Sequence, residues 1–237
     1  APFGRRVVQI ATRGIEVHRD GEQVIVTAAA GEPWDALVDF TVGQGWGGLE
    51  SLGGIPGLVG ATPVQNVGAY GQDVSAVISE VTALDRASGA IERLDAAACR
   101  FGYRTSLLKE QPGRWVVLSV CFVLRANTRS IVRYAELAGL LGIEPEQAAP
   151  VPRVHEAVLE LRRAKGMLLD PADPDTRSTG SFFVNPVVDP GVAAGLGQCP
   201  RYPAEGGVKV SAAWLIEQAG IDRGWSPPQC GGRVRIS

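Results

Sequence analysis

Short runs of apolar and β-branched residues alternate with polar ones at the start of the chain. This alternation predicts strands at 7–11, 15–18 and 23–28, and the Asp20-Gly21 pair between the last two is a strong hairpin signal. Apolar side chains then recur at helical spacing over 33–44, with Pro33 in the first turn. We therefore expect an antiparallel meander followed by an amphipathic helix.

The later part of the chain mixes both periodicities. Strands are expected at 77–85, 90–94, 114–124 and 181–188, and helices at 95–99, 131–141, 154–165, 192–196 and 211–219. Ser211 is a typical N-cap for the last helix and Gly220 a typical stop. This pattern predicts an α+β fold. The stretch 170–179 is rich in proline and aspartate, which is typical of a linker or exposed loop. We therefore expect two domains, 1–165 and 166–237.

Composition limits the classes of partner. The chain has 237 residues, 45% of them hydrophobic, and a formal charge of −2, so it can bury a core and carries no global basic field for nucleic acid. It contains no apolar run of the roughly 20 residues that a membrane span needs. Four scattered cysteines and two histidines make no recognisable zinc site and no Ser-His-Asp triad, so we interpret His18 and His155 as structural. The thiols are expected to be reduced, as in a cytoplasmic protein.

The segment 53–71 is the most informative part of the sequence. Its glycines permit positive φ and close backbone approach, and successive amides in such turns form concave anion sites. It is neither a Walker loop nor a Rossmann fingerprint, because the lysine and the spacing that these motifs need are absent. Composition alone also allows a buried glycine-rich connector that binds nothing.

Three further motifs follow this segment. They are Tyr-Arg-Thr-Ser-Leu-Leu-Lys at 103–109, Gly-Ser-Phe-Phe-Val-Asn-Pro at 180–186, and the stretch from Lys209 to Gly220. In this order the four motifs resemble the UDP-N-acetylenolpyruvoylglucosamine reductase (MurB) family and cover nearly the whole chain. The resemblance implies an FAD-binding lobe of the PCMH/vanillyl-alcohol-oxidase type, followed by a smaller α+β substrate-binding domain.

The resemblance also implies an activity. Members of this family reduce UDP-N-acetylglucosamine enolpyruvate to UDP-N-acetylmuramate in peptidoglycan precursor synthesis, with FAD as cofactor and NADPH as hydride donor. That places the expected function in cell wall biogenesis, cell shape and cell division, in the cytoplasm. We expect a monomer that binds a UDP-sugar, with no nucleic acid, membrane or metal partner. Alternatives are another FAD-linked oxidoreductase of the same fold, or an inactive flavin- or nucleotide-binding fragment.

Site residues follow from the resemblance position by position. Arg104 would face the substrate carboxylate, and Ser181 would donate the proton, although either could be an ordinary surface or turn residue. The implied cofactor contacts are Gly57, Gly60, Thr62, Gln65, Asn66, Gly68 and Ala69. The implied substrate contacts are Tyr70, Tyr134, Lys165, Asn185, Tyr202, Lys209 and Gln218. The chain has only three lysines, and two of them fall in this set.

The sequence departs from the family pattern in three places. The N-terminal flavin lobe with its Gly-Ser-Asn turn is expected before Ala1, and the segment with the catalytic Glu is expected beyond Ser237. We therefore expect the chain to be truncated at both ends, and no residue here takes the role of that Glu. Val184 stands where the family often has Lys.

Overall fold

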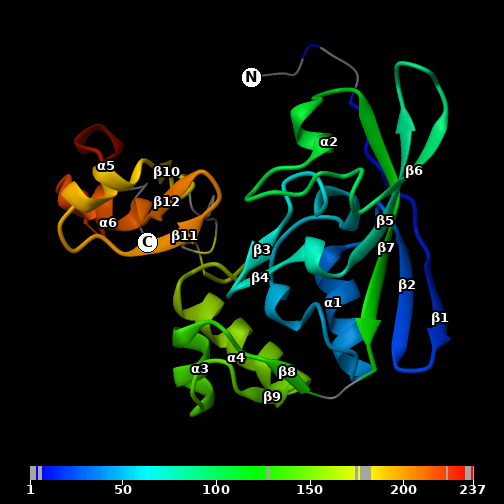
Figure 1. The fold of residues 1–237 in the computed structure, drawn as a ribbon, viewed down its shortest axis with the longest axis horizontal. Helices are drawn as coiled ribbons and strands as arrows, with labels where there is room; N and C mark the ends of the chain where they lie inside the picture. The colour runs from blue at the N-terminus through cyan, green and yellow to red at the C-terminus, as the bar shows by residue number, and fades with distance from the viewer. Residues whose placement is uncertain are drawn as a thin grey trace. The chain divides into compact units, whose positions relative to one another are not determined.

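The computed structural model describes residues 4, 7–126, 129–173, 176, 183–222, 224–232 and 236, which fall into two compact units, 1–164 and 165–237 (Figure 1). The helices and strands of the first unit are β1 (Ile15–Asp20), β2 (Gln23–Ala29), α1 (Trp34–Gly43), β3 (Gly68–Ala69), β4 (Gln72–Asp73), β5 (Ile78–Asp85), β6 (Ile91–Asp95), α2 (Leu107–Glu110), β7 (Trp115–Arg125), β8 (Arg129–Ile131), α3 (Ala135–Leu141), β9 (Ala148–Pro150) and α4 (Val151–Ala164). The short 3-10 helices Glu50–Leu52, Val59–Ala61 and Val74–Ala76 lie between α1 and β5.

An antiparallel five-stranded sheet, in the order β1-β2-β7-β5-β6, is the frame of the first unit. Alternate residues of β2 are buried, and each pairs with a buried residue of β7: Val24 with Leu124, and Val26 with Phe122. The period of two therefore gives this sheet one apolar face.

Helix α1 packs against that face. Trp34 lies with its ring centroid 6.0 Å from that of Phe122, and its indole N–H donates to the carbonyl of Leu52 at 2.9 Å. Leu37 and Val38 are fully buried in the same core as Leu49 and Leu52. The glycine-rich loops that follow α1 are thus part of a packed core, as their apolar residues indicate, and are not a solvated linker.

A second, smaller core lies between α3 and α4, with the β8–β9 pair beside it (Figure 1). Leu137 and Ala138 of α3 meet Val154 and Val158 of α4 there. Helix α4 also contacts α1 and the 3-10 helix Glu50–Leu52, so it links this core to the glycine-rich loops.

The second unit is built on a three-stranded antiparallel sheet in the order β10-β12-β11. Its elements are β10 (Val187–Val188), α5 (Pro190–Gly195), β11 (Arg201–Ala204), β12 (Gly207–Val210), α6 (Ala212–Gln218) and a 3-10 helix at Pro228–Cys230. A small core of Ala193, Cys199 and Val210 holds it together. Across the part of the chain that the structure describes, every helix is too short or too polar to cross a lipid bilayer.

Most of the expected elements form, but two are absent and two are shorter than expected. Residues 7–11 make no strand, and Val7 and Val8 are exposed. Residues 96–100 form turns in place of the expected helix. The Asp95 carboxylate accepts from the Ala98 amide, as an N-cap does, but Arg100 takes a φ of +45° and so ends this single helical turn. The expected helix 131–141 begins only at Ala135, since its first residue belongs to β8. Of the strand expected at 181–188, only Val187 and Val188 form one, β10. Residues 183–186 are irregular, and 181 and 182 lie outside the described residues.

Candidate functional site

The glycine-rich loop is fixed to the core by backbone hydrogen bonds. The Trp34 amide donates to the Gly57 carbonyl, the Val59 amide to Glu32 and the Gly60 amide to Ala30, at 2.9 to 3.0 Å. The loop is therefore held along the end of β2 and the start of α1. This attachment leaves its outer side as the surface on which a ligand could lie.

Three backbone amides at the start of the loop suit an anion. Among the residues that the structure describes, the amides of Ile55, Gly57 and Leu58 have no acceptor, although most amides from 59 to 67 are bonded. Gly57 takes a φ of +135° with open space where a Cβ would lie. Amides in such a glycine turn can bind phosphate oxygens, so the loop fits the diphosphate of a dinucleotide such as FAD.

Other predicted cofactor residues instead make packing contacts and hydrogen bonds within the protein that stabilise the loop. A Cβ on Gly60 would lie 2.6 Å from the Cβ of Ala30, so its missing side chain reflects internal packing. The Thr62 hydroxyl donates to the Val59 carbonyl at 2.8 Å. Asn66 donates from Nδ2 to the Gly102 carbonyl and accepts from the Ser75 amide, both at 3.0 Å. Gln65 is exposed and points to no protein partner among the described residues.

A tight hairpin closes the loop. The strands β3 and β4 are joined by Tyr70 and Gly71, whose φ values of +50° and +80° are those of a type I′ turn. The register of this hairpin places Asp73 opposite Gly68. Sequence reasoning missed Asp73, although the two-residue turn ending in glycine was a signal for the hairpin that positions it.

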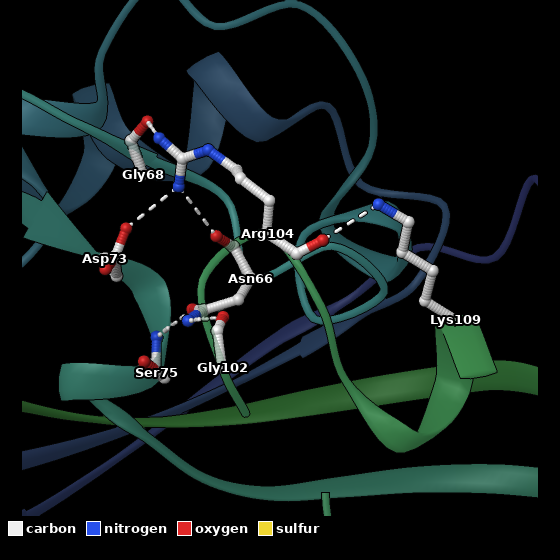
Figure 2. A network of polar contacts seen from close by, with 7 residues as sticks. All are labelled: Asn66, Gly68, Asp73, Ser75, Gly102, Arg104 and Lys109. Carbon is white, nitrogen blue, oxygen red and sulfur yellow. Dashed lines mark hydrogen bonds and ion pairs between the residues drawn. The ribbon is translucent and has the colours of Figure 1, made fainter. Parts of the chain in front are cut away.

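Arg104 is the centre of a polar network between this hairpin and the loop before α2 (Figure 2). Its Nη1 donates to the Asp73 carboxylate at 2.9 Å and to the Asn66 carbonyl at 3.1 Å, and its Nη2 donates to the Gly68 carbonyl. The Lys109 ammonium donates to the Arg104 carbonyl at 2.8 Å, where the backbone has a φ of +55°. The predicted catalytic arginine therefore bonds directly to two predicted cofactor residues of the loop, Asn66 and Gly68.

The two predicted substrate residues of the first unit are also together. The rings of Tyr70 and Tyr134 meet edge to face, with centroids 5.5 Å apart. Arg162 of α4 is buried nearby and interacts with Tyr70 and Asp35. Burial lowers the pKa of the Arg162 guanidinium, whereas Tyr70 and Asp35 act in the opposite direction. Although Arg162 lies in the last turn of α4, where a cation is commonly solvated, its side chain is buried.

In the second unit, three predicted substrate residues gather around β12. Tyr202 pairs with Lys209 across β11 and β12, with the Lys209 ammonium 5.8 Å from the tyrosine ring centroid. The Asn185 side-chain oxygen accepts from the Ala212 amide at 2.9 Å, beside the N-cap Ser211. Gln218 is exposed at the other end of α6, and Lys165 lies in the turn after α4. Ser181 lies outside the described residues.

Comparison with known proteins connects this geometry to a family. The FAD binding domain family matches residues 4–95. The chain is 49% identical to the UDP-N-acetylenolpyruvoylglucosamine reductase of Salinispora arenicola and 51% identical to that of Saccharopolyspora erythraea. These alignments cover 100% and 99% of this chain and 67% of each relative, so the chain spans two thirds of their length.

A solved structure has the same fold. The UDP-N-acetylenolpyruvylglucosamine reductase (MurB) of Thermus caldophilus aligns with a TM-score of 0.52 at 23% identity, over 84% of this chain and 55% of that one. Together with the identities near 50%, the comparisons establish that the chain belongs to the UDP-N-acetylenolpyruvoylglucosamine reductase family of FAD-dependent oxidoreductases.

Proposed function

We propose that the loop at 55–71 binds FAD and that Arg104 and Ser181 act on the enolpyruvyl group of the UDP-sugar that this family reduces. The observation that carries the proposal is the juxtaposition of two features. Three amides without an acceptor among the described residues, those of Ile55, Gly57 and Leu58, begin a loop that at its other end bonds to the Arg104 guanidinium. A cofactor on this loop would lie beside the cation that meets the substrate.

The chemistry divides between the cofactor and the protein. Bound FAD would supply the hydride relay between NADPH and the substrate double bond. Arg104 would hold the substrate carboxylate through two parallel hydrogen bonds and stabilise the negative charge that develops next to it. Ser181 would transfer its hydroxyl proton to the adjacent carbon, a step that needs cations or amides to stabilise the remaining oxygen.

The diphosphate of the substrate needs local cations, because the chain as a whole carries a charge of −2. We assign this role to Lys165 and Lys209, with Tyr202, Asn185 and Gln218 as further substrate contacts in a substrate-binding domain at 166–237. In the first unit, Tyr70 and Tyr134 would contact the substrate. We further propose that the enzyme works as a cytoplasmic monomer.

The test separates the two half-reactions. Replacing Ser181 with Ala should leave flavin reduction by NADPH nearly unchanged, because that step needs no proton from the serine. Transfer to the enolpyruvyl nucleotide should slow by about 10²–10⁴-fold, the usual loss on removing a general acid. Stopped-flow absorbance of the flavin measures both steps, with Ser88→Ala, in the turn before β6, as the control.

Three results would contradict the proposal. A wild-type protein that purifies without flavin absorbance and takes up no FAD would exclude the assigned loop function. Equal slowing of both half-reactions by Ser181→Ala would make this serine structural. Flavin reoxidation by oxygen, with none by the enolpyruvyl nucleotide, would favour an oxidase of the same fold.

A further inference from the structure

Some N–H groups of the Arg104 guanidinium are hydrogen-bonded to the protein, and others have no acceptor among the described residues. Of its five N–H groups, three donate to Asp73, Asn66 and Gly68 (Figure 2). Among the described residues, the remaining two N–H groups, one on Nε and one on Nη2, have no acceptor. These two nitrogens are neighbours on the planar group, and such a fork matches the two oxygens of a carboxylate.

Asp73 is the only charged group among the three acceptors. Its contact with Arg104 lies directly against Gly68 of the hairpin. A Cβ on Gly68 would lie 1.7 Å from the Asp73 carboxylate oxygen and 2.5 Å from Nη1 of Arg104. The ion pair therefore occupies the space that any other residue at position 68 would fill. Glycine at this position keeps the carboxylate and the guanidinium in contact.

Folding stability does not explain this arrangement well. The side chains of Arg104 and Asp73 are 27% and 45% exposed, and ion pairs with this much solvent contribute little to stability. Together with the Asn66 and Gly68 carbonyls, the carboxylate fixes the orientation of the guanidinium, because it bonds to Nη1 and so limits the rotation of the planar group. Orientation matters at a catalytic site, where small displacements of a binding group slow the reaction strongly.

We propose that Asp73 is a positioning residue for Arg104: its carboxylate holds the guanidinium so that the Nε and Nη2 hydrogens form a ready fork for the carboxylate of the substrate. This inference rests on the proposed function of Arg104. Asp73 itself touches neither substrate nor cofactor in this scheme. Its effect belongs to the step in which the substrate is bound and reduced, and flavin binding is independent of it.

The first experiment replaces Asp73 with Ala in the flavin-loaded enzyme. We expect transfer to the enolpyruvyl nucleotide to slow by about 10–100-fold, as is typical of a misplaced binding group. Flavin affinity, followed by fluorescence quenching, and flavin reduction by NADPH should stay within about twofold of wild type. Asp73→Asn keeps an oxygen that can accept from Nη1, so it should recover part of the loss. The control is Glu80→Ala, which removes the carboxylate from the 2.7 Å ion pair with Arg93 on the main sheet.

The second experiment asks whether Asp73 acts through Arg104. In an Arg104→Lys background the fork no longer exists, so adding Asp73→Ala should slow transfer by less than about twofold more, the signature of two coupled residues. The same loss in both backgrounds would overturn the proposal, as would loss of flavin from Asp73→Ala or a slowing equal to that of Glu80→Ala. A wild-type enzyme that binds flavin but does not reduce the enolpyruvyl nucleotide would instead overturn the proposed function.

Discussion

The imidazole of His155 lies in the space where a side chain on Gly53 would begin. A Cβ on Gly53 would be 2.5 Å from Cε1 and 2.7 Å from Nδ1 of the ring. The ring cannot move aside freely, because it is buried and its Nε2 lies 3.1 Å from the Asp39 carboxylate of α1. His155 therefore joins α4 to α1 and to the start of the glycine-rich loop.

This contact predicts the effect of a side chain at position 53. Gly53→Ala should destabilise the protein by about 1–3 kcal/mol, as overpacking of a closed site usually does. Gly139→Ala is the matched control: position 139 is an exposed position of helix α3 with nothing near its Cβ, and there alanine should stabilise by about 0.5–1 kcal/mol. Urea unfolding measures both. Equal stability of the two variants would show that the His155 contact is not tight.

A variant at Gly60 tests whether glycine is needed there for packing against Ala30 or for close approach of the cofactor. Gly60→Ala should lower stability in the absence of flavin by about 1–3 kcal/mol, because its Cβ would lie 2.6 Å from that of Ala30. Adding Ala30→Gly should restore part of the loss. If Gly60→Ala instead keeps full stability and loses only flavin affinity, the space that the Cβ would fill is needed by the bound cofactor.

The ion pair between Arg114 and Asp85 predicts a pH dependence of stability. Hydrogen bonds from Arg114 and from the Ala87 amide lower the pKa of the Asp85 carboxyl from 3.8 to about 2. Because the unfolded chain binds the proton more tightly, this stabilisation is complete above about pH 4 and is lost as the pH falls towards 2.

Removing the carboxylate should therefore remove that dependence. Asp85→Asn should be less stable than wild type at neutral pH, and the difference should shrink between about pH 4 and pH 2. Chemical unfolding across this range is the measurement, and Asp20→Asn, at the end of β1, is the control. If the difference in unfolding free energy between wild type and Asp85→Asn is the same at every pH, Asp85 stabilises the protein through packing and neutral hydrogen bonds and not through its charge.

The lysines of the second unit test the substrate class. Lys209→Met and Lys165→Met should each weaken binding of the enolpyruvyl nucleotide by about 10–150-fold, the loss expected for a charge-assisted hydrogen bond to phosphate. Flavin content should not change, since the flavin loop lies in the first unit. Titration of the flavin spectrum with the nucleotide measures the affinity.

Arg201 provides a control for these two variants. It belongs to the same hairpin as Lys209 but pairs with Val210, one position away, so its side chain leaves the strand on the opposite face. Arg201→Met should keep the affinity for the nucleotide. Wild-type affinity in both lysine variants, or loss of flavin in either, would contradict the proposed role in binding the diphosphate.

Elements encoded by neighbouring residues were predictable from the sequence. The β1–β2 hairpin forms at Gly21, where φ is +59°, and the Ser211 hydroxyl caps α6 by accepting from the Trp214 amide. Both depend on residues a few positions apart, whose chemistry the sequence displays directly. The alternation at 7–11 was misleading because a strand also needs a partner, and periodicity carries no information about which segment lies beside it.

The sequence by itself determined the local elements and, through its ordered motifs, the family and the candidate residues Arg104 and Gly57. Only the tertiary structure decided what those residues contact. Asp73 meets Arg104 across 31 positions of the chain, Gly60 faces Ala30, and Arg162, which the helical pattern places at a cationic end, is buried. The physical reason is that hydrogen bonds and packing act over a few ångströms in space, and folding brings together groups whose separation along the chain gives no sign of it.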